Sequence, residues 1–410
     1  MTEVKRESKL SKLKKKEFNL VEVIVIMIIT SICVSVVAII VSFTVNRKTR
    51  SFKTDSQLVE FATMYQRIND EYYDKIDKDE LIGSAIEGMV DYLDDPYTVY
   101  YSKTESQKIN KELDGEYIGI GVEIKLNKTN DGINQYVINK VFDNSPAQKA
   151  GVCENDILVK INNQTIEKKS IDEVSKLVQG KKNTKLKLTL ERKNNEINVE
   201  ILRSKVDMPS VSYRKVNKNG KNIGVVSISA FAENTSNQFK KIVKNFEEEK
   251  LDGLILDLRS NTGGYLKAAE ELLDMFLNKG DTLYQLNSKG KTNKIVNKRS
   301  RSINLKTVVL VNAKTASAAE IVTASLKENL NCAIVGTKTY GKGKVQKTRI
   351  LSNGSMIKYT TQNWLTPKGN KIDGEGITPT IEVKLTKDYI NAPSDATDSQ
   401  FQEAINQLIK

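Results

Sequence analysis

The sequence predicts a multidomain chain with one transmembrane helix, a helical region, a small β-rich module and an α/β unit. Three observations support this fold class. The chain has 410 residues, which corresponds to two or three domains at about 150 residues each. An uncharged apolar run lies near the N-terminus, and behind it the hydrophobic period changes from helical to strand-like and then alternates. With 39% hydrophobic and 28% charged residues, the composition is that of a folded protein.

The chain contains no histidine, and this absence excludes more function classes than any other count. It removes Ser-His-Asp and Cys-His catalysis and the HExxH zinc enzymes. Cys33, Cys153 and Cys332 form neither a CxxC motif nor a disulfide pattern, so we expect no metal and no cofactor. The net charge of +13 would suit nucleic acid, but acidic residues are interspersed throughout and only 6% of residues are aromatic. We therefore expect no nucleic-acid partner.

Residues 23–45 are predicted to form an uncleaved transmembrane anchor. They run for 23 positions without a charge, which exceeds the roughly 20 residues needed to cross a bilayer. Seven basic residues precede the run and four closely follow it, so the positive-inside rule predicts a single-pass protein of the cell membrane with a cytoplasmic N-terminus and an extracytoplasmic body. No A-x-A cleavage site follows the run. A buried core helix is the alternative, but it would not explain the basic leader.

Residues 55–113 are predicted to be helical, because Leu58, Phe61 and Tyr65 recur at helical spacing and a second such series starts at Leu81. Asp95-Pro96 marks a turn in this region.

From about Gly115 the hydrophobic period changes to two. A helix at 171–178 and a shorter helical turn after Ser145-Pro146 accompany short β-rich runs near residues 121–126, 135–142, 157–161, 185–190 and 197–202. About five strands and two helices in roughly ninety residues predict a small β-barrel-like module.

After Lys205 strands and helices alternate, which is typical of an α/β layer. We expect strands at 223–229, 253–258, 307–311 and 333–336, and helices at 233–250, 266–277 and from 316 to about 330.

Ser317 is a candidate nucleophile. It follows the apolar strand 308–311 and a turn of small residues, at the start of a predicted helix. Free amides at a helix N-terminus can hold a developing oxyanion. Serine is also a favoured N-cap, and most serines in such a position only cap the helix.

The segment Gly336 to Gln346 nearly matches the phosphate-binding pattern GxxxxGK[ST], but Gly343 stands where a hydroxyl must bind magnesium, and a strand-like run follows instead of a helix. The other use of a lysine among glycines is as a base. Burial disfavours the ammonium, so a buried Lys342 could accept the proton of a serine. A solvated loop lysine is the alternative.

Two glycine-containing segments could bind a ligand through their backbone. The strand 254–258 ends in a polar turn and the pair Gly263-Gly264, which lets amides approach a ligand closely. The Gly119-Ile120-Gly121 segment opens the β-rich module, and amides there could cradle a C-terminal carboxylate. A tight turn and a bent strand start are the respective alternatives.

Together these segments resemble the carboxy-terminal processing proteases, which are exported serine peptidases with a helical region, a PDZ domain and an α/β catalytic core. The match runs in the same order from about Phe61 to Val383. The segments that carry it are Asp95-Pro96-Tyr97, Gly119-Ile120-Gly121, Ser145-Pro146-Ala147 with Ala150-Gly151, Asp257-Leu258-Arg259 with Gly263-Gly264, Ala316-Ser317-Ala318 with Glu320, Gly341-Lys342-Gly343 with Val345-Gln346, and Thr366-Pro367 with Gly369.

The resemblance implies an α/β catalytic core of the ClpP/crotonase-like type with an inserted PDZ domain. It assigns residues as follows: 1–22 basic cytoplasmic tail, 23–45 transmembrane anchor, 55–113 helical region, 114–205 PDZ domain, 206–385 peptidase core and 386–410 C-terminal tail, partly helical. The main departures in the PDZ part are asparagines where glycine is common, at Asn155, Asn163 and Asn183. Asparagine tolerates left-handed backbone, so we expect these turns to form.

The resemblance also implies the roles of individual residues. Ser317 matches the nucleophile, Lys342 the general base, and Gln346 the residue that orients it. The amides of Gly263 and Ala318 match the oxyanion hole. The carboxylate-binding amides of the PDZ loop match Ile120, Gly121 and Val122.

We therefore expect a membrane-anchored, extracytoplasmic serine endopeptidase that binds free C-termini of proteins or peptides and cleaves with a Ser-Lys dyad. The alternative is a catalytically inactive PDZ scaffold of the cell envelope that only binds peptides. A homo-oligomer is also conceivable, because the amphipathic segment 399–409 could pack against a second subunit.

Overall fold

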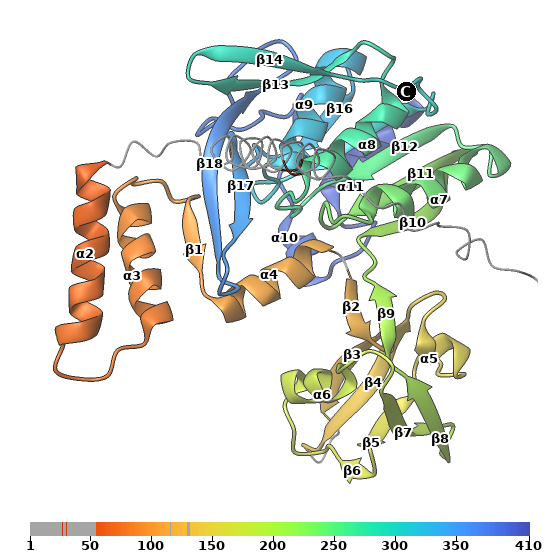
Figure 1. Ribbon diagram of the computed structural model, residues 1–410. Coiled ribbons are helices and arrows are strands. Elements are labelled where there is room, and N and C mark those ends of the chain that lie inside the picture. Colours follow the sequence, from red (N-terminus) through yellow and green to blue (C-terminus); the bar gives the residue numbers. More distant parts are fainter. Residues whose placement is uncertain (1–26, 28–29, 31–54, 115, 129–131) are drawn as a thin grey trace, which may run out of the picture. The chain divides into compact units, whose positions relative to one another are not determined.

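The computed structural model describes residues 27, 30, 55–114, 116–128 and 132–410 (Figure 1). The chain divides into two compact units, residues 1–81 and 82–410. In the first unit, α2 (Ser56–Glu71) begins after Asp55, whose carboxylate accepts a hydrogen bond from the Gln57 amide. The helix α3 (Lys78–Asp91) begins at the end of this unit. Both helices confirm the helical periodicity of this region.

The predicted fold class included one transmembrane helix, and this prediction is wrong for the part of the chain that the structure describes. Among those residues, no helix is both long and apolar enough to span a bilayer. The helix α2, for example, has 16 residues and carries Glu60, Arg67 and Asp70, whereas a span needs about 20 apolar residues. The run 23–45 itself lies outside the described residues, apart from Met27 and Thr30.

Among the described residues, a six-stranded sheet forms the centre of the second unit. Its order is β10 (Val211–Lys218), β11 (Lys221–Ile228), β12 (Gly253–Asp257), β15 (Lys306–Val311), β16 (Ala333–Gly336) and β19 (Ile381–Glu382). The strands β11 to β19 pair in parallel, and β10 is an antiparallel edge. This order confirms the α/β layer, and the predicted strands 223–229, 253–258, 307–311 and 333–336 are present.

Helices cover both faces of this sheet, which explains why the middle of its central strands, such as 254–256 and 308–311, is apolar on both faces. Side chains on one face, such as Leu254 and Val309, pack with α7 (Thr235–Glu248), α8 (Leu266–Phe276) and α9 (Ala318–Leu330). Side chains on the other face, such as Ile255 and Val308, pack with α11 (Ser399–Ile409).

The segment 399–409 therefore buries its apolar side in its own subunit. Phe401, Ala404 and Ile405 are almost completely buried against the sheet. This packing gives no support to the expected use of the segment as a contact with a second subunit. A short helix, α10 (Lys387–Asn391), precedes it.

The second unit also contains a second sheet. Its path is β1 (Val99–Tyr101), β18 (Met356–Leu365), β13 (Thr282–Ser288) and β14 (Lys291–Val296), and β17 (Lys344–Ile350) also pairs with β18. The strand β1 interrupts the region expected to be wholly helical, and α4 (Lys103–Asp114) follows it. Tyr100 pairs with Ile357, more than 250 positions away, so local periodicity carried no sign of this strand.

The β-rich module has a six-stranded sheet: β3 (Val122–Lys128), β4 (Asn134–Val141), β5 (Ile157–Ile161), β6 (Gln164–Thr165), β7 (Lys185–Arg192) and β8 (Asn195–Leu202). Its helices are α5 (Pro146–Lys149) and α6 (Ile171–Val178). The antiparallel pair β2 (Glu116–Gly119) and β9 (Ser204–Asp207) connects the module to the rest of the unit. Asn155, Asn163 and Asn183 have φ of 69°, 64° and 64°, which confirms the left-handed turns predicted for them.

Candidate active site

Three loops that follow parallel strands of the core sheet meet at one cleft. Carboxyl ends of parallel strands lie along the same edge of a sheet, where ligands usually bind. The loops are 258–264 after β12, 312–317 after β15 and 337–343 after β16. The cleft has a volume of about 590 Å³, and its lining includes Gly263, Ser317, Lys342 and Gln346. The structure thus brings together four predicted site residues that are far apart in the sequence.

Ser317 has a strained backbone immediately before α9. Its φ is 56° and its ψ is −119°, a region that costs a residue with a side chain about 1–3 kcal/mol. Hydrogen bonds hold the turn: the Ser317 amide donates to Glu320 at 2.8 Å, and the Ala316 amide donates to the Asn261 carbonyl at 2.9 Å. Such strain is typical of a residue whose side chain is fixed for a function.

Four lysines line the cleft, and only one of them lacks a polar partner among the described residues. Lys267 forms an ion pair with Glu271 at 4.0 Å. Lys344 forms an ion pair with Asp373 at 3.1 Å. Lys358 donates to the Tyr101 hydroxyl at 2.9 Å. The Lys342 ammonium has no hydrogen bond or ion pair within the described chain. Among the described residues, Lys342 is therefore the lysine of this cleft whose ammonium no acid or hydroxyl holds.

The surroundings of Lys342 also disfavour its charge. Burial lowers its pKa, and the charge of Lys358 lowers it further, while Asp95 and Glu320 act in the opposite direction. The Lys342 nitrogen lies 5.0 Å from the centre of the Tyr97 ring, which reaches the cleft because β1 pairs with β18. Burial and a hydrogen bond with Tyr340 raise the pKa of Tyr97 to about 12, so this phenol stays neutral at ordinary pH.

Glu320 connects the serine turn to the lysine loop, and sequence reasoning missed this role. The side chain is completely buried. One carboxylate oxygen accepts from the Ser317 and Lys342 amides at 2.8 and 2.9 Å. The other accepts from the Thr339 hydroxyl at 2.5 Å and the Gly341 amide at 2.7 Å. The available signal was a glutamate three residues after a helix-starting serine, but that pattern predicts only a cap.

The two amides predicted for the oxyanion hole differ in whether they already donate a hydrogen bond within the protein. The Ala318 amide belongs to the first turn of α9, where N–H groups have no acceptor in the preceding turn. The Gly263 amide instead donates to the Asn261 side-chain oxygen at 2.8 Å. Gly263 nevertheless lies against the nucleophile turn, because a β-carbon at this position would be 2.8 Å from the Ser317 β-carbon. Only the Ala318 amide is thus ready to bind an oxyanion.

Three regions of the chain match known families. Residues 222–383 match peptidase family S41, residues 137–192 a PDZ domain, and residues 38–105 the N-terminal domain of the activating protease CtpB. A probable CtpA-like serine protease of Staphylococcus aureus strain N315 is 36% identical over 368 residues, which are 88% of this chain and 72% of the relative. The chain belongs to peptidase family S41. It is a serine-type carboxy-terminal processing protease with a PDZ domain.

Other relatives agree with this family. A probable CtpA-like serine protease of Staphylococcus epidermidis is 36% identical over 386 residues, 93% of this chain and 76% of the relative. A solved structure from Bacteroides fragilis that is named as an S41 protease has a TM-score of 0.53 and 20% identity, and covers 83% of this chain and 92% of its own. At this identity it shows only that the fold is shared.

Gln346 lies on β17 at the point where its pairing register with β18 shifts. Its side-chain nitrogen is buried and has no hydrogen-bond partner in the described structure. Because an unsatisfied buried donor costs free energy, a donor in a peptidase cleft is available for a substrate or for the catalytic lysine. The position agrees with the predicted orienting role but does not test it.

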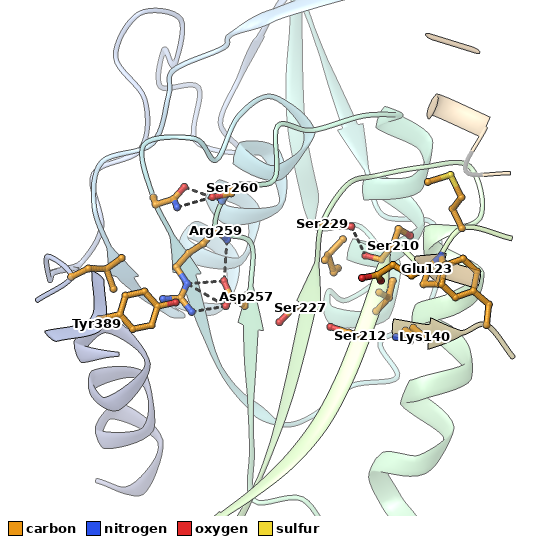
Figure 2. Close-up of a pocket in the computed structure, with 17 residues that line it drawn as sticks. Glu123, Lys140, Ser210, Ser212, Ser227, Ser229, Asp257, Arg259, Ser260 and Tyr389 are labelled. Carbon is orange, nitrogen blue, oxygen red and sulfur yellow. Dashed lines mark hydrogen bonds and ion pairs between the residues drawn. The ribbon is translucent and has the colours of Figure 1, made fainter. Parts of the chain in front are cut away.

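A partly buried ion-pair cluster supports the turn before Gly263. Figure 2 shows Asp257 and Arg259 facing each other, with nitrogen–oxygen distances down to 2.7 Å. The guanidinium also donates to Asp398 at 2.8 Å and to Gln400 at 3.2 Å. Burial opposes the charge of Arg259, but its acidic partners outweigh this effect and raise its pKa. Asp398 and Gln400, at the start of α11, thereby stabilise the start of the loop 258–264.

The PDZ loop lies between β2 and β3 and contains Ile120, Gly121 and Val122. Ile120 is completely buried, and its carbonyl accepts from the Ala147 amide at 2.8 Å. Gly121 has a φ of 81°, and a β-carbon there would lie 2.3 Å from that of Ser145. Only glycine fits this position, which explains the Gly-Ile-Gly sequence of the loop.

Proposed function

We propose that this S41 peptidase cleaves with Ser317 as nucleophile and Lys342 as general base, after its PDZ domain has bound the substrate's C-terminus. The observation that carries the proposal is the difference in polar partners among the lysines that line the cleft. Ser317 and Lys342 share one cleft, and Lys342 is the lysine there whose nitrogen no described acid or hydroxyl holds. In a chain without histidine, a neutral lysine is the base that can activate the serine.

In the proposed reaction, the neutral Lys342 amine takes the Ser317 proton as the serine oxygen bonds to the scissile carbonyl carbon. The Ala318 amide stabilises the oxyanion, and the Gly263 amide joins it after leaving Asn261. The Lys342 ammonium then protonates the leaving amine, and the C–N bond breaks to leave an acyl-serine. Water attacks the ester, again with Lys342 as base, and releases the new C-terminus.

The test compares Lys342→Ala and Ser317→Ala with Lys344→Ala, which removes the neighbouring lysine already paired with Asp373. We expect the first two variants to lose proteolysis of an unstructured substrate while they still bind a C-terminal peptide. Because Ser317 and Lys342 act as a unit, the double variant should be no worse than either single one. The Lys344→Ala variant should keep most of its activity. Activity of Lys342→Ala close to that of the unmodified chain would contradict the dyad, and peptide binding without any cleavage by the unmodified chain would favour the scaffold.

We also propose that the peptidase acts outside the cytoplasm. The support is the excess of basic residues before the run 23–45, a pattern typical of chains whose body is exported. Added protease should digest the domain in intact cells from which the wall has been removed, while a cytoplasmic marker survives. Protection of the domain until the cells are lysed would contradict this location.

A further inference from the structure

The cleft that contains Ser317 is lined by basic side chains and, among the described residues, by no acidic ones. Four lysines contribute to its lining, Lys267, Lys342, Lys344 and Lys358, and neither aspartate nor glutamate does. A cleft with this charge distinguishes peptides by the sign of their own side chains. The inference rests on the proposed function of the cleft, and it concerns which substrates the cleft accepts.

Two of these lysines already have an acidic partner. The Lys344 ammonium is 3.1 Å from Asp373, which neutralises it. Lys267 lies 4.0 Å from Glu271, and its side chain is 84% exposed, so water screens its charge. A third lysine, Lys342, is the proposed base and works as a neutral amine. The charge of the cleft therefore resides mainly on the fourth lysine.

That lysine, Lys358, is held by a partner that does not cancel its charge. Its ammonium donates to the Tyr101 hydroxyl at 2.9 Å and lies 5.2 Å from the centre of the same ring. Among the described residues, no carboxylate forms an ion pair with it. The side chain is half-buried. A substrate carboxylate in this cleft therefore meets a fixed ammonium that has no acidic partner.

The strand β18 directs Lys358 into the cleft. Figure 1 shows β18 beside β17, and Lys358 pairs with Thr348 of β17 on one side and with Val99 of β1 on the other. Alternate residues of a strand share a face. Met356 and Thr348 line the cleft together with Lys358, whereas Lys347, which precedes Thr348 on β17, does not. The ammonium thus faces a peptide that occupies the cleft.

We propose that this peptidase prefers substrates with an aspartate or glutamate close to the scissile bond, and that Lys358 binds this side chain. A carboxylate there accepts a charge-assisted hydrogen bond, which is stronger than one to a neutral acceptor. A lysine or arginine at the same place meets a like charge and is rejected. Lys358 is thus a specificity-determining residue that acts on the substrate and not on the nucleophile.

Occupation of this subsite also affects the base. Burial and the charge of Lys358 lower the pKa of Lys342, whereas Asp95 and Glu320 act in the opposite direction and the neutral Tyr97 ring lies beside the amine. A substrate carboxylate on Lys358 adds a negative charge, so it raises this pKa in the complex. Because the neutral amine is active, kcat should need a higher pH for an acidic peptide than for a neutral one. The kcat/KM profiles report the free enzyme and should rise at the same pH for both.

The test compares kcat/KM among matched peptides. The cut site in an unstructured peptide with an apolar free C-terminus is first located by mass spectrometry, and each residue near it is then replaced in turn by glutamate, glutamine or lysine. At one of these positions the glutamate peptide should be cleaved about three- to tenfold better than the glutamine peptide, and the lysine peptide worst. This range lies between the effects of an exposed and a buried charged pair, because Lys358 is half-buried. No preference for glutamate at any position would overturn the proposal.

Variants of Lys358 test whether this residue causes the preference. Lys358→Met removes the charge and should cleave the glutamate and glutamine peptides equally well. Lys358→Arg keeps the charge and should keep the preference, and Lys358→Glu should reverse it in favour of the lysine peptide. The matched control is Lys347→Met, which removes a charge from β17 outside the cleft and should retain the preference of the parent chain. A full preference in Lys358→Met would overturn the proposal. The parent chain gives a test without any variant, since kcat profiles that rise at the same pH for both peptides would contradict pairing on Lys358.

Binding to the chain that carries Ser317→Ala separates this proposal from the dyad. The glutamate and glutamine peptides are amidated at the C-terminus, so that the PDZ loop has no terminal carboxylate to bind. Tighter binding of the glutamate peptide that Lys358→Met abolishes would support the subsite, even if Lys342→Ala proved active and the dyad were wrong. Equal binding of the two peptides would overturn the subsite and leave the dyad in place.

Discussion

Replacing Glu320 by glutamine should both destabilise the catalytic core and remove most of its activity. The carboxylate accepts four hydrogen bonds, two on each oxygen, from Ser317, Lys342, Thr339 and Gly341. Glutamine has a single oxygen, so its amino group must face two of these donors. At about 1.5–3 kcal/mol for each bond to a charged acceptor, two lost bonds cost roughly 3–6 kcal/mol. The cost falls toward the lower end if the Thr339 hydroxyl rotates to accept.

The same change affects catalysis through position. One oxygen of Glu320 accepts hydrogen bonds from the amides of Ser317 and Lys342, the proposed nucleophile and base. Loss of this acceptor releases two backbone segments that must stay aligned for the proposed reaction. We expect kcat to fall by at least about 10², because small misplacements of reacting groups have effects of this size. KM should change less, because Glu320 is buried and does not reach the substrate.

The assay measures peptide hydrolysis and the denaturant midpoint of the core for Glu320→Gln beside Glu270→Gln. Glu270 accepts one hydrogen bond, from the Tyr284 hydroxyl, so the glutamine oxygen can replace it. The control should stay within about 1 kcal/mol of the parent chain. If Glu320→Gln kept both the midpoint and the kcat of the parent, the carboxylate would not be what aligns Ser317 with Lys342.

Three further predictions follow from the site. Because burial lowers the pKa of Lys342 and the neutral amine is the active form, kcat/KM should rise with pH through that pKa; a flat profile from about pH 5 to 9 with chemistry rate-limiting would contradict a lysine base. Asp398→Asn keeps an N-cap for α11 but weakens the ion pair with Arg259, so kcat should fall about tenfold. Asp395→Asn breaks an exposed ion pair and should have little effect in the same assay. Gly263→Ala should lose at least about 10² in kcat, because φ is 102° and the new methyl would lie 2.9 Å from a backbone carbonyl; unchanged kcat would show that the turn can move.

Much of the catalytic core could be predicted from local patterns. Runs such as 254–256 and 308–311 are apolar at every position, which is what strands buried on both faces require. Ser317 and Lys342 stood out because each follows such a strand among small residues. A tight turn needs glycine, so Gly121 and Gly263 were visible as well.

Other features depended on contacts between distant parts of the chain. The strand β1 exists because β18 pairs with it, and the segment 399–409 turned out to cover its own sheet. The role of Glu320 depends on a loop that begins seventeen residues after it, at Thr337.

The sequence by itself determined the order of strands, helices and glycine turns, because hydrophobic period and backbone freedom act between neighbouring residues. Only the tertiary structure decided which lysine of the cleft is unpaired among the described residues, since Asp373 and Tyr101 come from other parts of the chain to hold Lys344 and Lys358. Charge pairing and burial act through space, so the pKa of Lys342 is a property of the folded chain.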